Sequence, residues 1–232
     1  MKAMILAAGR GERMRPLTDI TPKPLLPVGG KPLIVWHIEK LAAAGFNEII
    51  INHAYLGQQI EDTLGSGQQW DVDIRYSPEG EALETAGGIA KALPLLGNGS
   101  FLVVNGDVWC DLDFARFSAR GLAQLMQGKH AHLAMVSNPA HNTQGDFQLG
   151  SDGHLSSDTS NRLTYSGIGM YRAELFAGIN PGEKAKLLPY LLRAIVAKRV
   201  TGEHFTGSWT DVGTPDRLHE LDEAIKAGQP QH

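Results

Sequence analysis

The chain has 232 residues, of which 42% are hydrophobic, so it is long enough and apolar enough to fold around a sizeable core. Its net charge of −4 gives no general attraction for nucleic acid, and no apolar run approaches the about 20 residues of a membrane span. The N-terminus lacks signal-peptide features and the single cysteine, Cys110, excludes an internal disulfide, so we expect a cytoplasmic protein with neither nucleic acid nor membrane as a partner.

Short apolar runs alternate with helical patterns over residues 1–110. The patterns predict buried strands over 4–8, 48–53, 72–76 and 101–105, and helices over 32–45, 55–64 and 85–95, with Thr85 as the cap of the last helix. This alternation implies parallel strands joined by right-handed crossovers, with helices on both faces of one sheet. Ligands bind at the carboxyl ends of such strands, so the loop after the first strand and Gly106-Asp107 after the fourth are expected to face one crevice.

The pattern changes after Asp111. It predicts a helix over 112–126, a strand over 132–137, a hairpin over 145–155, an extended segment over 163–171, and helices over 187–198 and 215–227. No linker, repeat or low-complexity tract separates the two parts. We therefore expect a single α/β domain over residues 1–232, with a Rossmann-like, doubly wound, mostly parallel sheet and a lobe inserted in its second half.

The stretch Leu6–Val28 contains the end of the first strand and the loop that follows it, and it reads LAAGRGERMRPLTDITPKPLLPV. It is neither a dinucleotide-binding turn nor a P-loop, because the third glycine and the Gly-Lys-Ser/Thr sequence are missing. Gly9 and Gly11 still leave backbone amides open to an anion, and Arg13 and Lys23 add positive charge. Four prolines stiffen the segment. A polyphosphate cradle accounts for this stiffening, and a solvated basic loop is the alternative.

Four segments occur in order along the chain: the opening loop with its Pro-Lys-Pro, Leu83–Gly87 (LETAG), Gly106-Asp107, and Trp209–Thr214 (WTDVGT). In this combination the sequence resembles the sugar-1-phosphate nucleotidyltransferases. The resemblance implies that a phosphate oxygen of a sugar 1-phosphate attacks the α-phosphorus of a nucleoside triphosphate and releases pyrophosphate. It also implies that residues 1–110 bind the nucleotide, that residues 111–232 bind the sugar phosphate, and that the inserted lobe holds the sugar.

Within this family, the compact chain is most similar to members that transfer UMP from UTP to N-acetylmuramate 1-phosphate in peptidoglycan recycling. Thymidylyl transfer to glucose 1-phosphate and guanylyl transfer to mannose 1-phosphate are the alternatives within the family. A catalytically inactive regulatory subunit is the alternative of a different class, although such subunits are expected to lose the acidic and basic residues that this chain keeps. The absence of the C-terminal extension that many relatives carry favours a monomer.

The resemblance assigns catalytic roles to four side chains. Asp107 and Asp211 follow predicted strands and would hold the Mg²⁺ that bridges the reacting phosphates, since carboxylate oxygens suit this ion. Arg13 would stabilise the leaving pyrophosphate, and Lys23 would contact the α-phosphate and the attacking sugar phosphate. Taken alone, Asp107 has the alternative role of a turn residue.

The remaining expected contacts also come from the resemblance. The residues expected to bind the nucleotide are Ala8, Gly9, Gly11, Glu12, Arg13, Lys23, Gly80, Gly87 and Asn105. Those expected to bind the sugar are Asn105, Gly145, Asp146, Asp158 and Arg162. The Gly-Asp of the hairpin is equally consistent with turn chemistry.

Two departures from the family pattern leave specificity open. Ala82 stands where relatives that bind uridine or thymidine nucleotides often have Gln, and Glu84 replaces the usual Gly, so the base is not assigned by side chains. The Glu-Lys-Pro that binds sugar hydroxyls in many relatives is also missing, and Asp158 is nearest to its position. We hypothesise that this leaves room for the lactyl group of a muramic sugar and that Arg162 meets its carboxylate.

His130 and His132 are spaced to lie on one face of a predicted strand. The sequence offers no neighbouring cysteine and no third ligand beside them, so we do not expect a zinc site.

Overall fold

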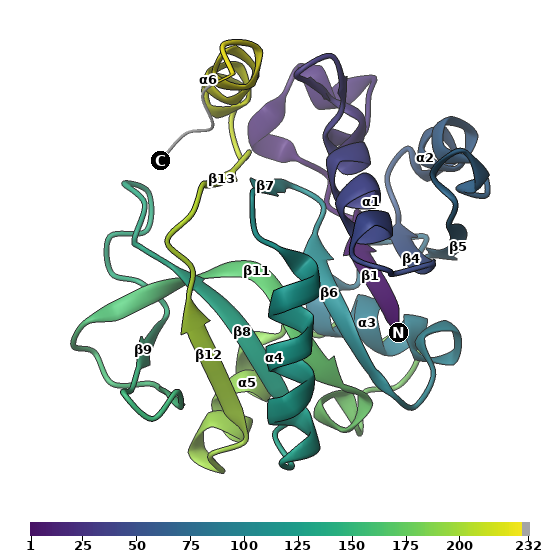
Figure 1. Cartoon of the computed structure of the whole chain (residues 1–232). Coiled ribbons are helices and arrows are strands. Elements are labelled where there is room, and N and C mark those ends of the chain that lie inside the picture. The colour runs from purple at the N-terminus through teal and green to yellow at the C-terminus, as the bar shows by residue number, and fades with distance from the viewer. Residues whose placement is uncertain (229–232) are drawn as a thin grey trace.

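The computed structural model describes residues 1–228 and is drawn in Figure 1. Its main sheet has nine strands in the order β10-β9-β11-β6-β1-β4-β5, and β8 and β12 extend the sheet from β11. The strands of this sheet are β1 (Lys2–Leu6), β4 (Glu48–His53), β5 (Asp73–Pro78), β6 (Ser100–Asn105), β8 (Ala131–Val136), β9 (Phe147–Leu149), β10 (Leu155–Ser156), β11 (Arg162–Arg172) and β12 (Val200–His204).

The four strands predicted for the first half form the parallel part of the sheet. β1 pairs in parallel with both β4 and β6, and β4 pairs in parallel with β5. The first strand begins and ends two residues before the predicted 4–8, because Ala7 and Ala8 already belong to the loop. The carboxyl ends of these strands therefore meet along one edge, as the alternating sequence predicted.

The second half continues the same sheet. β11 is antiparallel to β6 on one side and to β8 on the other, and β12 is parallel to β8. The predicted hairpin is confirmed, since Leu155 of β10 lies opposite Leu149 of β9. The α/β class and the mostly parallel sheet are therefore confirmed, with β11 as an antiparallel strand inside the sheet.

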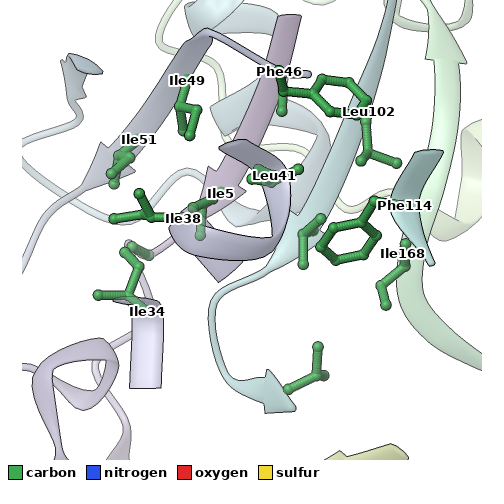
Figure 2. Close-up of a cluster of buried hydrophobic side chains, with 14 of the residues drawn as sticks. Ile5, Ile34, Ile38, Leu41, Phe46, Ile49, Ile51, Leu102, Phe114 and Ile168 are labelled. Carbon is green, nitrogen blue, oxygen red and sulfur yellow. The ribbon is translucent and has the colours of Figure 1, made fainter. Parts of the chain in front are cut away.

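Of the six helices within residues 1–228, the first five cover the two faces of the main sheet, and the last packs against Pro27–Val28 and Trp209–Asp211 (Figure 1). They are α1 (Leu33–Ala43), α2 (Gly57–Leu64), α3 (Glu84–Leu96), α4 (Phe114–Met126), α5 (Leu188–Val196) and α6 (Pro215–Lys226). Side chains of α1, α2 and α4 pack on one face; Figure 2 shows Ile34, Ile38 and Leu41 of α1 and Phe114 of α4 among the buried side chains of this cluster. Side chains of α3 and α5 pack on the other face. In the part of the chain that the structure describes, no helix has the length and apolar character needed to cross a bilayer.

The ends of two helices test the helix caps that the sequence predicted, Gly45 and Thr85. Gly45 follows α1 with a φ of +83°, and the amides of Gly45 and Phe46 donate to the carbonyls of Ala42 and Leu41, as predicted for a glycine after a helix. Thr85, in contrast, does not cap its helix. It lies in the first turn of α3, where neighbouring amides donate to the carbonyl oxygen of Ala185 instead. A carbonyl from a distant segment thus replaces the predicted hydroxyl cap.

A small second sheet joins the middle of the chain to its C-terminal part. β7 (Val108–Cys110) follows β6 directly, and β13 (Trp209–Asp211) pairs with it in antiparallel register. Helix α1 holds β7 in place: Nε2 of His37 lies 2.7 Å from the carbonyl oxygen of Val108, and Nζ of Lys40 donates to that of Cys110 at 2.6 Å. A further pair, β2 (Pro27–Val28) and β3 (Lys31–Pro32), leads from the opening loop into α1.

Candidate active site

A cavity of about 330 Å³ opens at the carboxyl ends of the parallel strands. Its lining includes the end of β1 and the start of the opening loop, and polar side chains that end or follow the neighbouring strands β4, β5 and β6. Lys23 enters from the opening loop, and Lys184 comes from the segment before α5. Lys184 is the lining residue that comes from the second half of the chain, so the cavity belongs almost entirely to residues 1–110.

The structure brings five of the predicted residues together in the lining of this cavity: Ala8, Gly9, Lys23, Asn105 and Asp107. The Lys23 side chain is almost completely buried, and its Nζ donates to Oδ2 of Asp107 at 2.7 Å. A buried ammonium needs such a partner, because an unpaired charge is costly away from water. The opening loop and the end of β6 therefore meet in one charged contact.

The opening loop folds on itself through three short 3-10 turns, Glu12–Met14, Leu17–Asp19 and Lys23–Leu25. Thr18 donates to the carbonyl oxygen of Gly11 at 2.9 Å, which closes the loop. Gly11 has a φ of +69°, and a side chain there would press on the stem of Lys23, with 3.3 Å to its Cβ. A glycine at this position therefore lets the loop pass close to the buried lysine.

Asp19 separates the cations of the loop into two groups. Arg10 and Arg15 both pair with Oδ1 of Asp19, at 3.1 and 2.8 Å, and their hydrogen bonds hold the pKa of this carboxyl below its ordinary value. Arg13 and Lys23 point elsewhere, Lys23 to Asp107 and Arg13 toward Gly213. The two cations singled out by the resemblance are thus those that the loop does not use for its own fold.

Asp211 approaches Asp107 through the backbone. The β13–β7 pairing sets Asp211 opposite Val108, and the amide of Val212 donates to the carbonyl oxygen of Asp107 at 2.9 Å. The Asp211 carboxylate is mostly buried and lies 3.2 Å from both Arg217 and His141. It does not line the cavity but lies beside it. Sequence reasoning therefore placed both acids at strand ends correctly, and the small sheet brings their backbones together.

Arg13 lies next to the same motif. A Cβ added to Gly213 would come within 3.0 Å of the Arg13 guanidinium and would collide with that of Arg217. The arginine of the opening loop is thus packed against the WTDVGT segment, outside the residues that line the cavity. The two loop cations therefore lie on different sides: Lys23 faces Asp107, and Arg13 faces the segment of Asp211.

The donor set at the two acids fits a magnesium ion. Asp107 and Asp211 offer carboxylate oxygens, and cations hold both carboxylates in place: Lys23 on one side, Arg217 on the other. Over residues 1–228, no three side chains of the His, Cys, Asp or Glu type converge on one point. A site with two protein carboxylates suits Mg²⁺, because this ion keeps several waters and takes phosphate oxygens as further ligands.

Five residues expected at the nucleotide do not line the cavity: Gly11, Glu12, Arg13, Gly80 and Gly87. Gly80 has a φ of +76° in the turn after β5. Gly87 lies inside α3, where its amide donates to the carbonyl of Ala185 at 3.0 Å and a side chain would collide with the carbonyl of Glu183. Gly87 thus allows the segment that carries Lys184 to approach α3 closely.

The residues expected at the sugar, apart from Asn105, are also outside the lining of the cavity. Gly145 has a φ of +62° and closes the turn before β9 through its amide, which donates to the carbonyl of Asn142, and Asp146 accepts a hydrogen bond from the amide of Tyr165 in β11 at 2.7 Å, so both serve the local fold. The Arg162 guanidinium donates to the backbone carbonyls of Asp158 and Ser157 at 2.6 and 2.5 Å. Arg162 therefore closes the loop that holds Asp158, and its contact with a lactyl carboxylate stays a prediction.

The two histidines of the H-x-H pattern have structural surroundings. Nδ1 of His132 lies 2.9 Å from Oγ1 of Thr201, and its Nε2 lies 3.4 Å from Glu203. His130 precedes β8, and burial lowers its pKa. Neither belongs to a cluster of three ligand side chains among the residues that the structure describes.

Three polar side chains that line the cavity were not singled out from the sequence: Asn52, Glu79 and Lys184. Asn52 and Glu79 stand at the carboxyl ends of β4 and β5, so the rule that identified Asn105 and Asp107 would have found them as well. No local signal marks Lys184, because a distant contact with α3 brings its segment to the cavity.

Comparison with known proteins agrees with this geometry. The family described as "Nucleotidyl transferase" matches residues 2–228. The N-acetylmuramate alpha-1-phosphate uridylyltransferase of Neisseria meningitidis serogroup B is 57% identical over 95% of this chain and 96% of its own. The protein of the same name from Caulobacter vibrioides is 34% identical over 92% of each chain. A solved structure from Bacillus anthracis, provisionally named a glucose-1-phosphate thymidylyltransferase, covers 97% of this chain and 95% of its own with a TM-score of 0.85; at 23% identity it shows the shared fold.

Proposed function

The chain belongs to the nucleotidyl transferase family, and from this premise we propose that it transfers UMP from UTP to N-acetylmuramate 1-phosphate, giving UDP-N-acetylmuramate and pyrophosphate. The names of the two full-length relatives support the choice of substrates. The buried contact between Lys23 and Asp107, at the carboxyl end of a parallel strand, is the observation that supports the reaction itself. We assign the activity to the recycling of cell-wall sugars.

The reaction needs charge compensation more than it needs a base. A phosphate oxygen of the sugar 1-phosphate forms a bond to the α-phosphorus of UTP, the bond from that phosphorus to the β-phosphate oxygen breaks, and pyrophosphate leaves. The attacking oxygen is already an anion, so no proton has to be removed. Two highly charged anions must nevertheless be brought together, and fixed positive charges in a partly dry cavity do this efficiently.

The cations of the site have separate places in this proposal. Lys23 lies in the cavity and is proposed to contact the α-phosphate and the attacking phosphate. Arg13, on the side of Gly213, is proposed to hold the β- and γ-phosphates and the leaving pyrophosphate. Gly9 leaves its backbone open to the triphosphate, since a side chain there would meet no atom within 4 Å. Lys184, at the cavity from the opposite segment, adds a third cation for the sugar phosphate.

We propose that Asp107 and Asp211 hold one Mg²⁺. Such an ion would supply neutralisation of charge on the phosphate oxygens. The protein's own residues supply the rest: Lys23 and Arg217 fix the two carboxylates, and the β7–β13 pairing fixes their backbones.

The remaining expected contacts stay predictions of the same proposal. Ala8, Gly11, Glu12, Gly80, Gly87 and Asn105 are proposed on the nucleotide side. On the sugar side, the proposed residues are Asn105, Gly145, Asp146, Asp158 and Arg162.

A substrate panel tests the function. Each nucleoside triphosphate is combined with Mg²⁺ and with the 1-phosphates of N-acetylmuramate, N-acetylglucosamine, glucose and mannose, and released pyrophosphate is measured. We expect the fastest turnover with UTP and N-acetylmuramate 1-phosphate. Preference for dTTP with glucose 1-phosphate, or for GTP with mannose 1-phosphate, would instead support the alternative transferases, and no turnover with any pair would support an inactive regulatory protein. Equal turnover of the muramyl and glucosaminyl phosphates would contradict the proposed lactyl contact.

A further inference from the structure

The cavity wall contains a buried polar pair that the proposed reaction does not use. Asn52, at the end of β4, is 2% exposed, and Glu79, just after β5, is 8% exposed. Both line the cavity. A carboxylate is rarely buried without a specific set of hydrogen-bond partners, because taking it out of water is costly. The partners of this pair therefore indicate what it does.

The pair forms a directed chain of hydrogen bonds. The amide of Ala7 donates to Oδ1 of Asn52 at 2.9 Å, and Nδ2 of Asn52 donates to Oε1 of Glu79 at 2.6 Å. The amide of Leu83 donates to Oε2 of Glu79 at 2.8 Å. The two backbone amides can only donate, so the orientation of the Asn52 amide and the need for two acceptor oxygens at position 79 are both fixed.

The chain of hydrogen bonds ties four segments of the cavity together. It connects the loop after β1 (Ala7), the end of β4 and the segment after β5 with the residue before α3 (Leu83). Helix α3 leaves room for it only through Gly88, where a Cβ would come within 2.8 Å of Nδ2 of Asn52 and would collide with Glu79. The packing around the pair is thus adapted to its presence.

The pair lies at the far end of the cavity from the reacting phosphates. The strand order is β6-β1-β4-β5, so three strand spacings, about 14 Å, separate the strand before Asp107 from the strand before Glu79. Between the two ends lie Ala8 and Gly9, and beyond Leu83 the wall continues with Glu84 and Thr85. With the triphosphate at Lys23 and Asp107, this far end is the part of the cavity left for the nucleobase.

We propose that Asn52 and Glu79 are a positioning pair that fixes the backbone on both sides of the base, at 7–8 and at 83–85, and thereby decides which nucleobase is accepted. This inference rests on the proposed function. Uracil presents one N–H donor between two carbonyl acceptors, whereas guanine presents two adjacent donors beside one carbonyl. Backbone groups held in one fixed arrangement match one of these edges and leave the polar groups of the other unpaired, which is how a hydrogen-bonding site rejects a wrong substrate.

A charge-neutral exchange of the two side chains tests the proposal. In Glu79→Gln, the new amide nitrogen faces a donor, either Nδ2 of Asn52 or the amide of Leu83. In Asn52→Asp, two carboxylates face each other. In the double variant N52D/E79Q, every donor meets an acceptor again. The amide of Ala7 donates to one oxygen of the new carboxylate at position 52, the new side-chain amide at position 79 donates to the other, and Leu83 keeps an acceptor. Side-chain volumes and net charge are conserved.

We expect each single variant to raise the KM for UTP by about tenfold or more and to narrow the preference for UTP over GTP, with little change in the KM for the sugar phosphate. Because thymine presents the same hydrogen-bonding edge as uracil, the affinity for dTTP is expected to change in parallel with that for UTP. The double variant is expected to regain most of the affinity for UTP and the base preference. Asp62→Asn is the matched control, because Asp62 accepts from Gln58 in a similar amide–carboxylate pair on the exposed surface of α2.

Single variants that fold and keep the KM and the base preference of the original protein would overturn the proposal. So would a double variant that is impaired as strongly as the two single variants combined, or one that fails to fold, because the exchange conserves donors, acceptors and volume. If a single variant does not fold, the double variant tests the inference instead: a base preference like that of the original protein supports it, and a lost base preference overturns it. Calorimetric binding of UTP, dTTP and GTP without sugar phosphate distinguishes failure of this inference from failure of the proposed function. If the protein binds nucleotides base-selectively and the selectivity is lost in the single variants and regained in the double variant, but no turnover occurs, only the proposed function is refuted.

Discussion

Lys23 and Asp107 show how single side chains give the cavity its chemistry. The buried ammonium and the carboxylate lie 2.7 Å apart, so each holds the other in a fixed orientation before any substrate arrives. Asp211 has the same relation to Arg217, at 3.2 Å. Both acids are therefore preorganised, which lowers the reorganisation that the reaction requires.

Removing either acid is expected to stop the reaction while leaving the fold intact. Asp107→Ala and Asp211→Ala should each lower kcat by about 10²–10³-fold or more, because one ligand of the proposed ion and the orientation of one cation are lost together. Pyrophosphate release at saturating substrates measures the effect, and circular dichroism checks the fold. Asp62→Ala, which removes an exposed acid on α2, is the control. Full rates in both variants would show that the two acids do not hold the metal.

The sequence was most informative for residues whose neighbours in the chain already limit their position. Lys23 and Asp107 could be predicted because a stiff loop and a buried strand lead to them. The cavity also contains Asn52 and Glu79, which satisfy the same strand-end rule but were not recognised. Arg162 shows what the sequence does not reveal. Its guanidinium donates to the carbonyls of Ser157 and Asp158, and no sequence pattern indicates that these local hydrogen bonds occupy the side chain.

Helix α3 and the segment before α5 form one unit at the cavity. The amides of Ala86 and Gly87 donate to the carbonyl oxygen of Ala185, and the amide of Ala185 donates to that of Leu83, all at 3.0 Å. These contacts cap the helix and hold Lys184 at the cavity. The predicted cap, Thr85, was wrong because the capping group comes from a segment far away in the sequence.

Gly87→Ala tests this unit. A methyl group there would collide with the carbonyl of Glu183, so the segment must move away and carry Lys184 with it. We expect kcat/KM for the sugar phosphate to fall by about tenfold or more, with a smaller loss of stability than of activity. Gly99→Ala is the matched control, because no atom lies within 4 Å of an added Cβ at that site. Unchanged kinetics in Gly87→Ala would show that the contact does not position Lys184.

The fold as a whole could be predicted further than its details. The alternation of strands and helices up to Asn105 led directly to the parallel part of the sheet. The antiparallel insertion of β11 between β6 and β8 could not be predicted, because a buried strand carries the same apolar pattern in either direction. The register shift between Tyr165 and Gly169 in β11 contains Gly167, which has a φ of +80° that glycine adopts readily.

A buried histidine makes the stability of the whole molecule depend on pH. Burial lowers the pKa of His37 to about 4, with Lys40 lowering it further and the hydrogen bond to Val108 and the charge of Asp107 opposing the shift. The unfolded chain takes up this proton near its ordinary pKa of 6.5, while the folded chain resists until about 4. The neutral, buried His37 therefore makes its full contribution to the free energy of unfolding above pH 6.5. This contribution, about 3 kcal/mol in total, is lost as the pH falls toward 4.

His37→Gln should remove this part of the pH dependence. Between pH 7 and pH 4, the free energy of unfolding of the original chain is expected to fall by about 3 kcal/mol more than that of the variant. Urea denaturation at several pH values measures both. His219→Gln, at an exposed position on α6, should keep the original profile. Parallel profiles for the original chain and His37→Gln would show that His37 is not protected from protonation in the fold.

The pairing of β13 with β7 has a consequence for how the protein is made. The ribosome delivers the cavity-lining residues up to Asp107 early, and N-terminal parts of a chain begin to fold during synthesis. Asp211 joins them only through a contact between strands that are far apart in the sequence, which is a late and slow kind of event in folding. A nascent chain can therefore form most of the cavity lining well before both acids are in place. If the two acids act as proposed, activity waits until β13 has been synthesised, and a product truncated before β13 would lack the second acid.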